Sequence, residues 1–194
     1  MNKMIGNLFW IAVAAILAGC AQLSPQQVQF VPSIEQSSVP RGNGAGILVN
    51  VTDRRTSTVI GQRGGTYADT SSITASNELR RLIEDLAEEV LTQGGYRLDG
   101  SSVDMQMSIY LDELSYQLED LDAVRKRATA AARVSVEVFR DRSNYSNSYR
   151  AQRSIETFRY PSEERNDELL NRVLETALNR MFSDAGLENF LNAF

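Results

Sequence analysis

The sequence of 194 residues contains no histidine, one cysteine and only two lysines, Lys3 and Lys126. Without histidine, and with a single thiol, the chain lacks the usual ligands of transition metals and the members of His-based catalytic triads. A serine–lysine pair beyond the N-terminal segment could use only Lys126. Carboxylate pairs, as in glycosidases, stay open, but none stands out by its spacing. These absences predict that the protein is not an enzyme and binds no metal or cofactor.

Positive charge is also scarce. The chain has 20 basic and 25 acidic residues, which gives a net charge of −5. Affinity for nucleic acids comes mainly from lysine and arginine side chains against phosphate groups. We therefore expect no nucleic-acid partner. A single thiol also cannot form a disulfide within the chain, whatever the redox compartment.

A single long apolar run, residues 8–17, follows a short segment that carries Lys3 and ends at Leu17-Ala18-Gly19-Cys20. The run is shorter than the roughly 20 apolar residues of a membrane-spanning helix, and its flanks are typical of a signal peptide. The cysteine after the small residues resembles the bacterial lipobox, whose thiol is diacylated before the chain is cut and the new amino group acylated. This resemblance predicts cleavage between Gly19 and Cys20 and lipidation of Cys20. The alternative is an uncleaved anchor with a structural free cysteine.

The lipid decides the expected location. One acyl chain such as palmitate binds membranes only marginally, whereas two or more give stable anchoring. The residue after Cys20 is Ala21 and not aspartate, which in the sorting rule of Gram-negative lipoproteins implies the outer membrane. We expect a signal peptide in residues 1–19 and a protein that is held on the outer membrane by acylated Cys20 and faces the periplasm.

Residues 20–45 are rich in Gln, Ser, Pro and Gly and show neither helical nor strand periodicity. This composition predicts a lipidated flexible tether in front of one folded domain, residues 46–194, whose length suits a single domain. The segment Gly42-Asn43-Gly44-Ala45-Gly46 superficially suggests a phosphate-binding loop. Such a loop follows a strand and opens a helix, whereas this segment follows the tether and opens a strand, so we reject that interpretation.

Two amphipathic helices are indicated by apolar residues at three- and four-residue spacings. The first covers residues 79–91 and ends at Gly94-Gly95, which supplies a left-handed stop. The second covers residues 169–182 and has acidic residues before it, as the helix dipole favours. A short apolar stripe over residues 187–194 is expected to dock as a terminal turn, and a free partner-binding helix is the alternative.

Alternating apolar residues predict the strands. The expected strands are a short one at residues 47–52, an optional second short one at residues 59–62, and three long strands within 103–118, 128–138 and 145–159. The apolar phase of the first long strand changes near Asp112-Glu113, which predicts a β-bulge there. The expected fold class is α+β: a mainly antiparallel sheet of four to five strands, with two helices packed on one face, in the order β-(β)-α-β-β-β-α.

The outward face of the three long strands is a candidate partner surface. A hairpin centred near residues 142–143 would place Ser135 opposite Arg150 and Arg133 opposite Gln152. Arg127, Arg133 and Arg150 would then lie together, beside Gln106 and Tyr110 of the preceding strand.

Guanidinium groups make bidentate contacts with carboxylates and phosphates. This face could therefore bind an envelope protein or an anionic glycolipid such as lipid A. The alternative is a solvated sheet face on which Glu137 and Asp104 balance the charge.

The lipobox, the Gly95-Tyr96 that closes the first helix, the Ser148-Tyr149-Arg150-Ala151 of the last strand and the aromatic C-terminal end together resemble the YajG-like family of outer-membrane lipoproteins. The resemblance covers nearly the whole chain. It implies location and fold, but no catalytic residues, because the family has no settled biochemical function. More distantly, the layout is similar to lipoproteins that assist envelope transport complexes. The expected function is a non-enzymatic periplasmic binding domain. The alternatives are an accessory subunit of a lipid, polysaccharide or protein export complex and, third, an enzyme acting on glycan.

The lipobox leads to a first prediction. In a Cys20→Ser variant, globomycin-sensitive processing and retention in the outer membrane should both disappear, because the acyl acceptor is gone. Cell fractionation and the electrophoretic mobility of the precursor measure the two effects. A variant that is still processed and still fractionates with the outer membrane would contradict the anchor.

Overall fold

The structure, a computed structural model, describes residues 23–35, 41–65 and 68–192. Within these residues one mixed sheet of seven strands runs in the order β1-β4-β3-β5-β6-β7, and β2 also pairs with β5. The strands are β1 (Gln26–Val28), β2 (Ile47–Asp53), β3 (Val59–Gln62), β4 (Ser72–Ala75), β5 (Met105–Asp120), β6 (Arg125–Arg140) and β7 (Ser143–Phe158). The helices are α2 (Leu79–Gln93), α3 (Glu163–Phe182) and α4 (Ala185–Asn192), with a short 3-10 helix, η2 (Ala68–Thr70).

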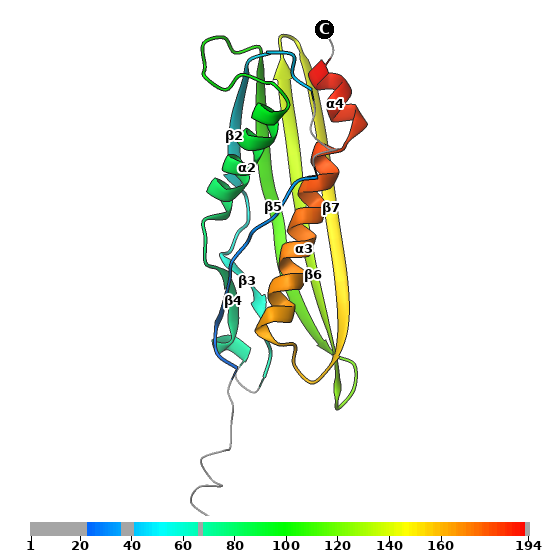
Figure 1. Cartoon of the computed structure of the whole chain (residues 1–194). Helices are drawn as coiled ribbons and strands as arrows, with labels where there is room; N and C mark the ends of the chain where they lie inside the picture. The colour runs from blue at the N-terminus through cyan, green and yellow to red at the C-terminus, as the bar shows by residue number, and fades with distance from the viewer. Residues whose placement is uncertain (1–22, 36–40, 66–67, 193–194) are drawn as a thin grey trace, which may run out of the picture.

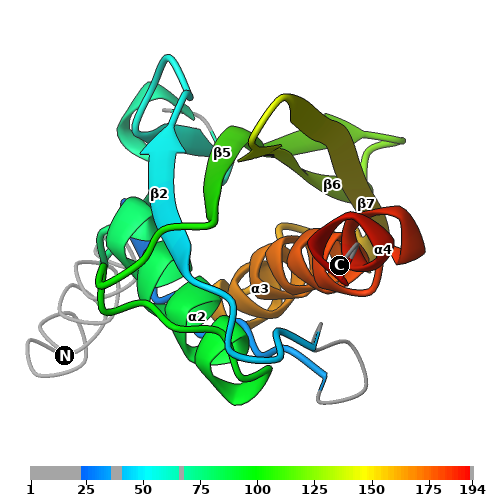
Figure 2. The ribbon, with the colours of Figure 1, turned by 90° about the horizontal axis from the view of Figure 1, so that it is seen from above.

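The helices α2, α3 and α4 lie on the same face of the sheet and leave the other face open (Figure 2). Helix α2 packs on β2, and α3 packs on β6 and β7. Between the layers lies one hydrophobic core, with Ile83 of α2, Ile109 of β5 and Leu174 of α3 almost fully buried. Within the described ranges, no helix has the length and apolar character that crossing a membrane requires.

The predicted α+β class, the two main helices and the three long strands are confirmed. The predicted bulge is also confirmed, since the pairing of β5 with β6 shifts between Leu111 and Glu113. The mainly antiparallel sheet of four to five strands is wrong: β1–β4, β2–β5 and β3–β5 are parallel, and β3–β4, β5–β6 and β6–β7 are antiparallel. The order of elements along the chain also differs from the expected one, because it contains two further strands, β1 and β4. These strands are too short and too polar to show alternation in the sequence. Strand β4 pairs with both β1 and β3.

The C-terminal stripe docks on the domain, as expected. It forms the eight-residue helix α4, and its Leu187 and Leu191 are almost fully buried. The carboxylate of Asp184 accepts the N–H groups of Gly186 and Leu187 at 2.6 and 3.0 Å and so caps the start of this helix. In Figure 1 helix α4 lies beside β7, at the end of the molecule opposite to β4.

Residues 23–35, which we call the strap, were expected to belong to the flexible tether, and the structure contradicts this. Strand β1 within the strap pairs in parallel with β4, and Phe30 is only 1% exposed. Figure 1 shows the strap in blue, running from β4 toward α3. The packed domain therefore begins well before residue 46. The tether prediction failed because alternation over three residues is too short to detect, and the buried apolar partners are distant in sequence.

The strap is held mainly through its backbone. Asn171 and Asn179 of α3 each accept one strap N–H and donate to one strap C=O, and Glu175 between them accepts another N–H. The bonds are 2.8 to 3.2 Å long and involve the N–H groups of Val31, Ser33 and Glu35 and the C=O groups of Gln29 and Ser33. Four residues of helix advance about 6 Å, and two residues of extended chain about 6.6 Å, so the two spacings match.

The packed strap gives a second prediction, which uses two adjacent residues. Phe30→Ala should lower the free energy of unfolding by about 3–5 kcal/mol, because it opens a cavity in the core. Val31→Ala, at a side chain that is 71% exposed, should change it by less than about 0.5 kcal/mol. Urea denaturation of the mature chain measures both. Equal, small effects would show that the strap is not packed.

Candidate functional site

The predicted lipidation site, Cys20 after Gly19, lies outside the described residues, so cleavage and acylation stay predictions. The predicted partner surface is described. Arg127, Arg133 and Arg150 lie on the open face of the sheet, on β6 and β7, with side chains that are 40, 44 and 52% exposed. The sequence therefore placed these three residues on the correct face.

The predicted neighbours within this surface are wrong. Arg133 lies directly opposite Arg150, and Ser135 opposite Ser148, because β6 ends at Arg140 and β7 already begins at Ser143. The turn is thus one residue earlier than expected, and the pairing shifts by two residues. Since side chains alternate between faces with a period of two, such a shift keeps every residue on its face and changes only its neighbours.

Two like charges directly opposite each other are unfavourable, and the β-bulge of β5 compensates for this pair. The bulge turns the adjacent residues Asp112 and Glu113 both toward the open face, since Leu111 and Leu114 on either side are buried. Glu113 then lies 3.3 Å from the guanidinium of Arg133 and 3.7 Å from that of Arg150. One carboxylate therefore bridges the two arginines.

The other charges of this face are also paired. Arg127 contacts Glu156 at 2.8 Å and Glu119 at 3.6 Å. The guanidinium of Arg54 lies 3.2 Å from the ring centre of Tyr110 and 4.0 Å from Asp112, whose carboxylate accepts a hydrogen bond from Ser135. The hydroxyl of Tyr110 donates to Glu137 at 3.1 Å.

This arrangement makes the open face a balanced mosaic of both charges and not a cationic patch. In the alternative of a solvated face, Glu137 and Asp104 were expected to balance the arginines; the structure has Glu137 accepting from Tyr110 and Asp104 accepting the backbone N–H of Gly46 at 2.7 Å. The groups that balance the arginines are Asp112, Glu113, Glu119 and Glu156. In the described part of the chain, no group of three or more His, Cys, Asp or Glu residues could hold a metal ion.

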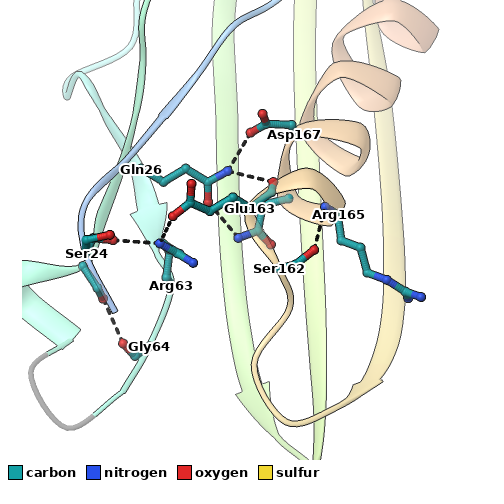
Figure 3. A network of polar contacts seen from close by, with 10 residues as sticks. Ser24, Gln26, Arg63, Gly64, Ser162, Glu163, Arg165 and Asp167 are labelled. Atoms are coloured by element: carbon teal, nitrogen blue, oxygen red, sulfur yellow. Dashed lines mark hydrogen bonds and ion pairs between the residues drawn. The ribbon is translucent and has the colours of Figure 1, made fainter. Parts of the chain in front are cut away.

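A second polar cluster, which the sequence did not predict, joins the strap to the start of α3 (Figure 3). Arg63, which is 6% exposed, donates to the carboxylate of Glu163 at 2.5 Å and to the C=O of Ser24 at 3.0 Å. The amide of Gln26 donates to the C=O of Glu163 at 2.9 Å and to the carboxylate of Asp167 at 2.6 Å. We call this cluster, together with Asn166 and Tyr116, the clasp.

The inner part of the clasp is buried. Asn166 is fully buried; it donates to the side-chain oxygen of Gln26 at 2.9 Å and accepts from the hydroxyl of Tyr116 at 2.8 Å. Burial raises the pKa of Tyr116 to about 12, and the nearby Arg63 lowers it only in part. Burial also raises the pKa of Asp167, against the hydrogen bond from Gln26. The buried face of α3 is apolar from Leu169 onward, but Asn166, three residues earlier on the same face, is polar. A polar residue at this spacing is the sequence signal that could have indicated this site.

The chain is similar in sequence to a family of lipoproteins. A family model described as "Uncharacterized lipoprotein" matches residues 32–192. The protein named Uncharacterized lipoprotein YajG from Escherichia coli strain K12 is 24% identical over 187 residues, which cover 95% of each chain. The sequence of the same name from E. coli O6:H1 gives the same values.

Solved structures with similar chains include a protein from Xanthomonas campestris, with a TM-score of 0.49 and 10% identity over 89% of this chain and 99% of that chain. A minor lipoprotein from Acinetobacter baumannii has a TM-score of 0.43 and 12% identity, over 77% of this chain and 96% of that one.

The clasp gives a third prediction. Tyr116→Phe should cost about 1–3 kcal/mol at neutral pH, because it leaves the buried oxygen of Asn166 without a donor. An unfolded tyrosine releases its proton near pH 10, whereas folded Tyr116 keeps it to about 12. Stability should therefore fall between pH 10 and 12, and this fall should be smaller in the variant. Urea denaturation across this pH range measures both effects; an unchanged pH dependence would contradict the buried phenol.

Proposed function

The chain belongs to the family described as uncharacterized lipoproteins, and on this premise we propose that it is a non-enzymatic, lipid-anchored binding protein of the outer membrane that faces the periplasm. The match over residues 32–192 and the relationship to YajG confirm the expected family. The lipobox that ends at Cys20 and the alanine after it support anchoring in the outer membrane. The chemistry of the sequence, without histidine and with one thiol, supports binding over catalysis.

The observation that carries the proposal of binding is the open face of β5, β6 and β7. These strands have 16 residues each, so the face is about 50 Å long, and α2, α3 and α4 all lie on the other side (Figure 2). Its arginines stay about half exposed although each has a carboxylate nearby. A partner can therefore reach both kinds of charge.

The charge pattern also indicates the kind of partner. A simple polyanion such as a phosphorylated glycolipid would meet the carboxylates of Glu113, Glu119 and Glu156 as well as the arginines. A protein surface that carries both charges can complement this mosaic, and such complementarity sets specificity and association rate. We therefore favour an envelope protein over an anionic glycolipid as the partner of this face.

A charge reversal tests this proposal. Arg133→Glu with Arg150→Glu should abolish crosslinks between the anchored protein and its partner in intact cells, because both groups that contact Glu113 change sign. The matched control is Arg153→Glu with Arg172→Glu, the same charge change on the helix-covered side between β7 and α3. Mass spectrometry identifies the crosslinked proteins, and circular dichroism checks the fold of both variants. Unchanged crosslinks in a folded Arg133/Arg150 variant would remove this surface from consideration.

A further inference from the structure

One end of the molecule carries a group of exposed apolar side chains. Phe158, at the end of β7, is 79% exposed, the highest value for a large apolar residue in the described ranges. Val124 in the β5–β6 turn is 52% exposed, and Tyr160 after β7 is 40% exposed. The N–H of Arg159 donates to the C=O of Val124 at 2.8 Å, which holds these two loops together. We call this group, Val124, Phe158 and Tyr160, the end patch.

The strap begins at the same end. Two glycines of positive φ, Gly64 and Gly65, form a turn that separates Leu23 from Tyr160. A Cβ atom on Gly65 would lie 3.5 Å from the side chain of Leu23, and one on Gly64 would lie 2.8 Å from the ring of Tyr160. Leu23 and Tyr160 thus lie on either side of the Gly64–Gly65 turn. The start of the strap and the β5–β6 turn both lie at the lower end of the molecule in Figure 1.

The position of Leu23 limits how far this end can lie from a lipid on Cys20. Three residues of fully extended chain span at most about 10 Å. Because the strap is packed and does not act as a tether, an acylated Cys20 would hold the end patch next to the headgroups of the bilayer. This step rests on the lipid anchor of the proposed function.

The charges at this end suit a bilayer surface. The carboxylates around the β5–β6 turn are each paired with a cation: Glu119 with Arg127, Asp120 with Lys126 and Asp122 with Arg125. No ion pair in the described part of the chain engages the guanidinium of Arg159 or Arg165. Arg165 lines a surface cavity of about 430 Å³ together with Phe158, Tyr160 and Glu156, and the carboxylate of Glu156 is paired with Arg127. A cationic group therefore lies beside the exposed rings.

We propose that the end patch is a membrane-contact surface: Phe158, Tyr160 and Val124 enter the headgroup region of the bilayer that holds the lipid anchor, while Arg159 and Arg165 face lipid phosphates. Tyrosine is enriched at this interface, apolar side chains such as phenylalanine bury at its boundary with the acyl chains, and cations near it gain from anionic lipids.

In this contact the long strands rise from the membrane. Arg133 lies eight residues from Arg125 along β6, so its distance from this end is about 27 Å. Arg133 and Arg150 are then too far from the headgroups to reach a glycolipid of the same leaflet, which agrees with a protein as their partner.

Tryptophan fluorescence tests the contact. The sole tryptophan, Trp10, precedes Cys20, so the mature chain has none, and Phe158→Trp creates a single reporter. Phe139→Trp is the matched control, because Phe139 is 49% exposed near the opposite end of β6. The lipidated full-length mature protein is reconstituted into vesicles of phosphatidylethanolamine, phosphatidylglycerol and phosphatidylcholine brominated in the upper part of its acyl chains.

The expected result is a blue shift and strong quenching in the Phe158→Trp protein, with neither change in the Phe139→Trp protein. Vesicle flotation of the same samples reports the anchor separately. Protein that floats but shows no quenching after Phe158→Trp would overturn the membrane contact, leave the anchor intact and assign the end patch to a protein partner. Protein that does not float would overturn the anchor and the contact together.

Discussion

The docking of the strap on β4 and α3 is the constraint on which the rest of the arrangement depends. It joins residues near the start of the folded chain to a helix about 140 residues later. The ladder of Asn171, Glu175 and Asn179 bonds to backbone groups, so it secures the path of the strap with little demand on its side chains. The clasp around Arg63 and Asn166 then fixes where the strap enters. Together they decide at which end of the molecule the preceding segment emerges.

The open face is polar because the helices pack on only one side of the sheet. The helices α2, α3 and α4 cover one side of the sheet (Figure 2), so the other side needs polar residues. A β-bulge adds a second carboxylate at Asp112-Glu113, where two arginines on adjacent strands would otherwise repel. The face is therefore neutralised locally, by pairs that are still accessible to solvent and to a partner. Exposed pairs of this kind contribute little to stability, which leaves them free to serve recognition.

The family, the anchor and the geometry fit one view of the molecule. The end patch lies beside the strap entry, the open face runs along strands about 50 Å long, and α4 closes the far end. A lipid on Cys20 would then orient the domain as well as retain it, because only two residues separate that cysteine from the packed strap. Arg133, Arg150 and Glu113 would stand away from the headgroups and face other proteins of the envelope.

The sequence by itself determined the lipobox, the family, both long amphipathic helices, the three long strands with their bulge, and the face on which Arg127, Arg133 and Arg150 lie. The lipobox and the family were read from short motifs, whereas the helices, the strands and the face of the arginines depend on local periodicity, which ten or more residues establish. Only the tertiary structure decided the parallel pairings of β1, β2 and β3, the exact partner of each arginine, and the packing of the strap. Those outcomes depend on contacts between residues far apart in the chain: three residues of β1 carry no readable alternation, and their hydrogen-bond partners lie on β4 and α3.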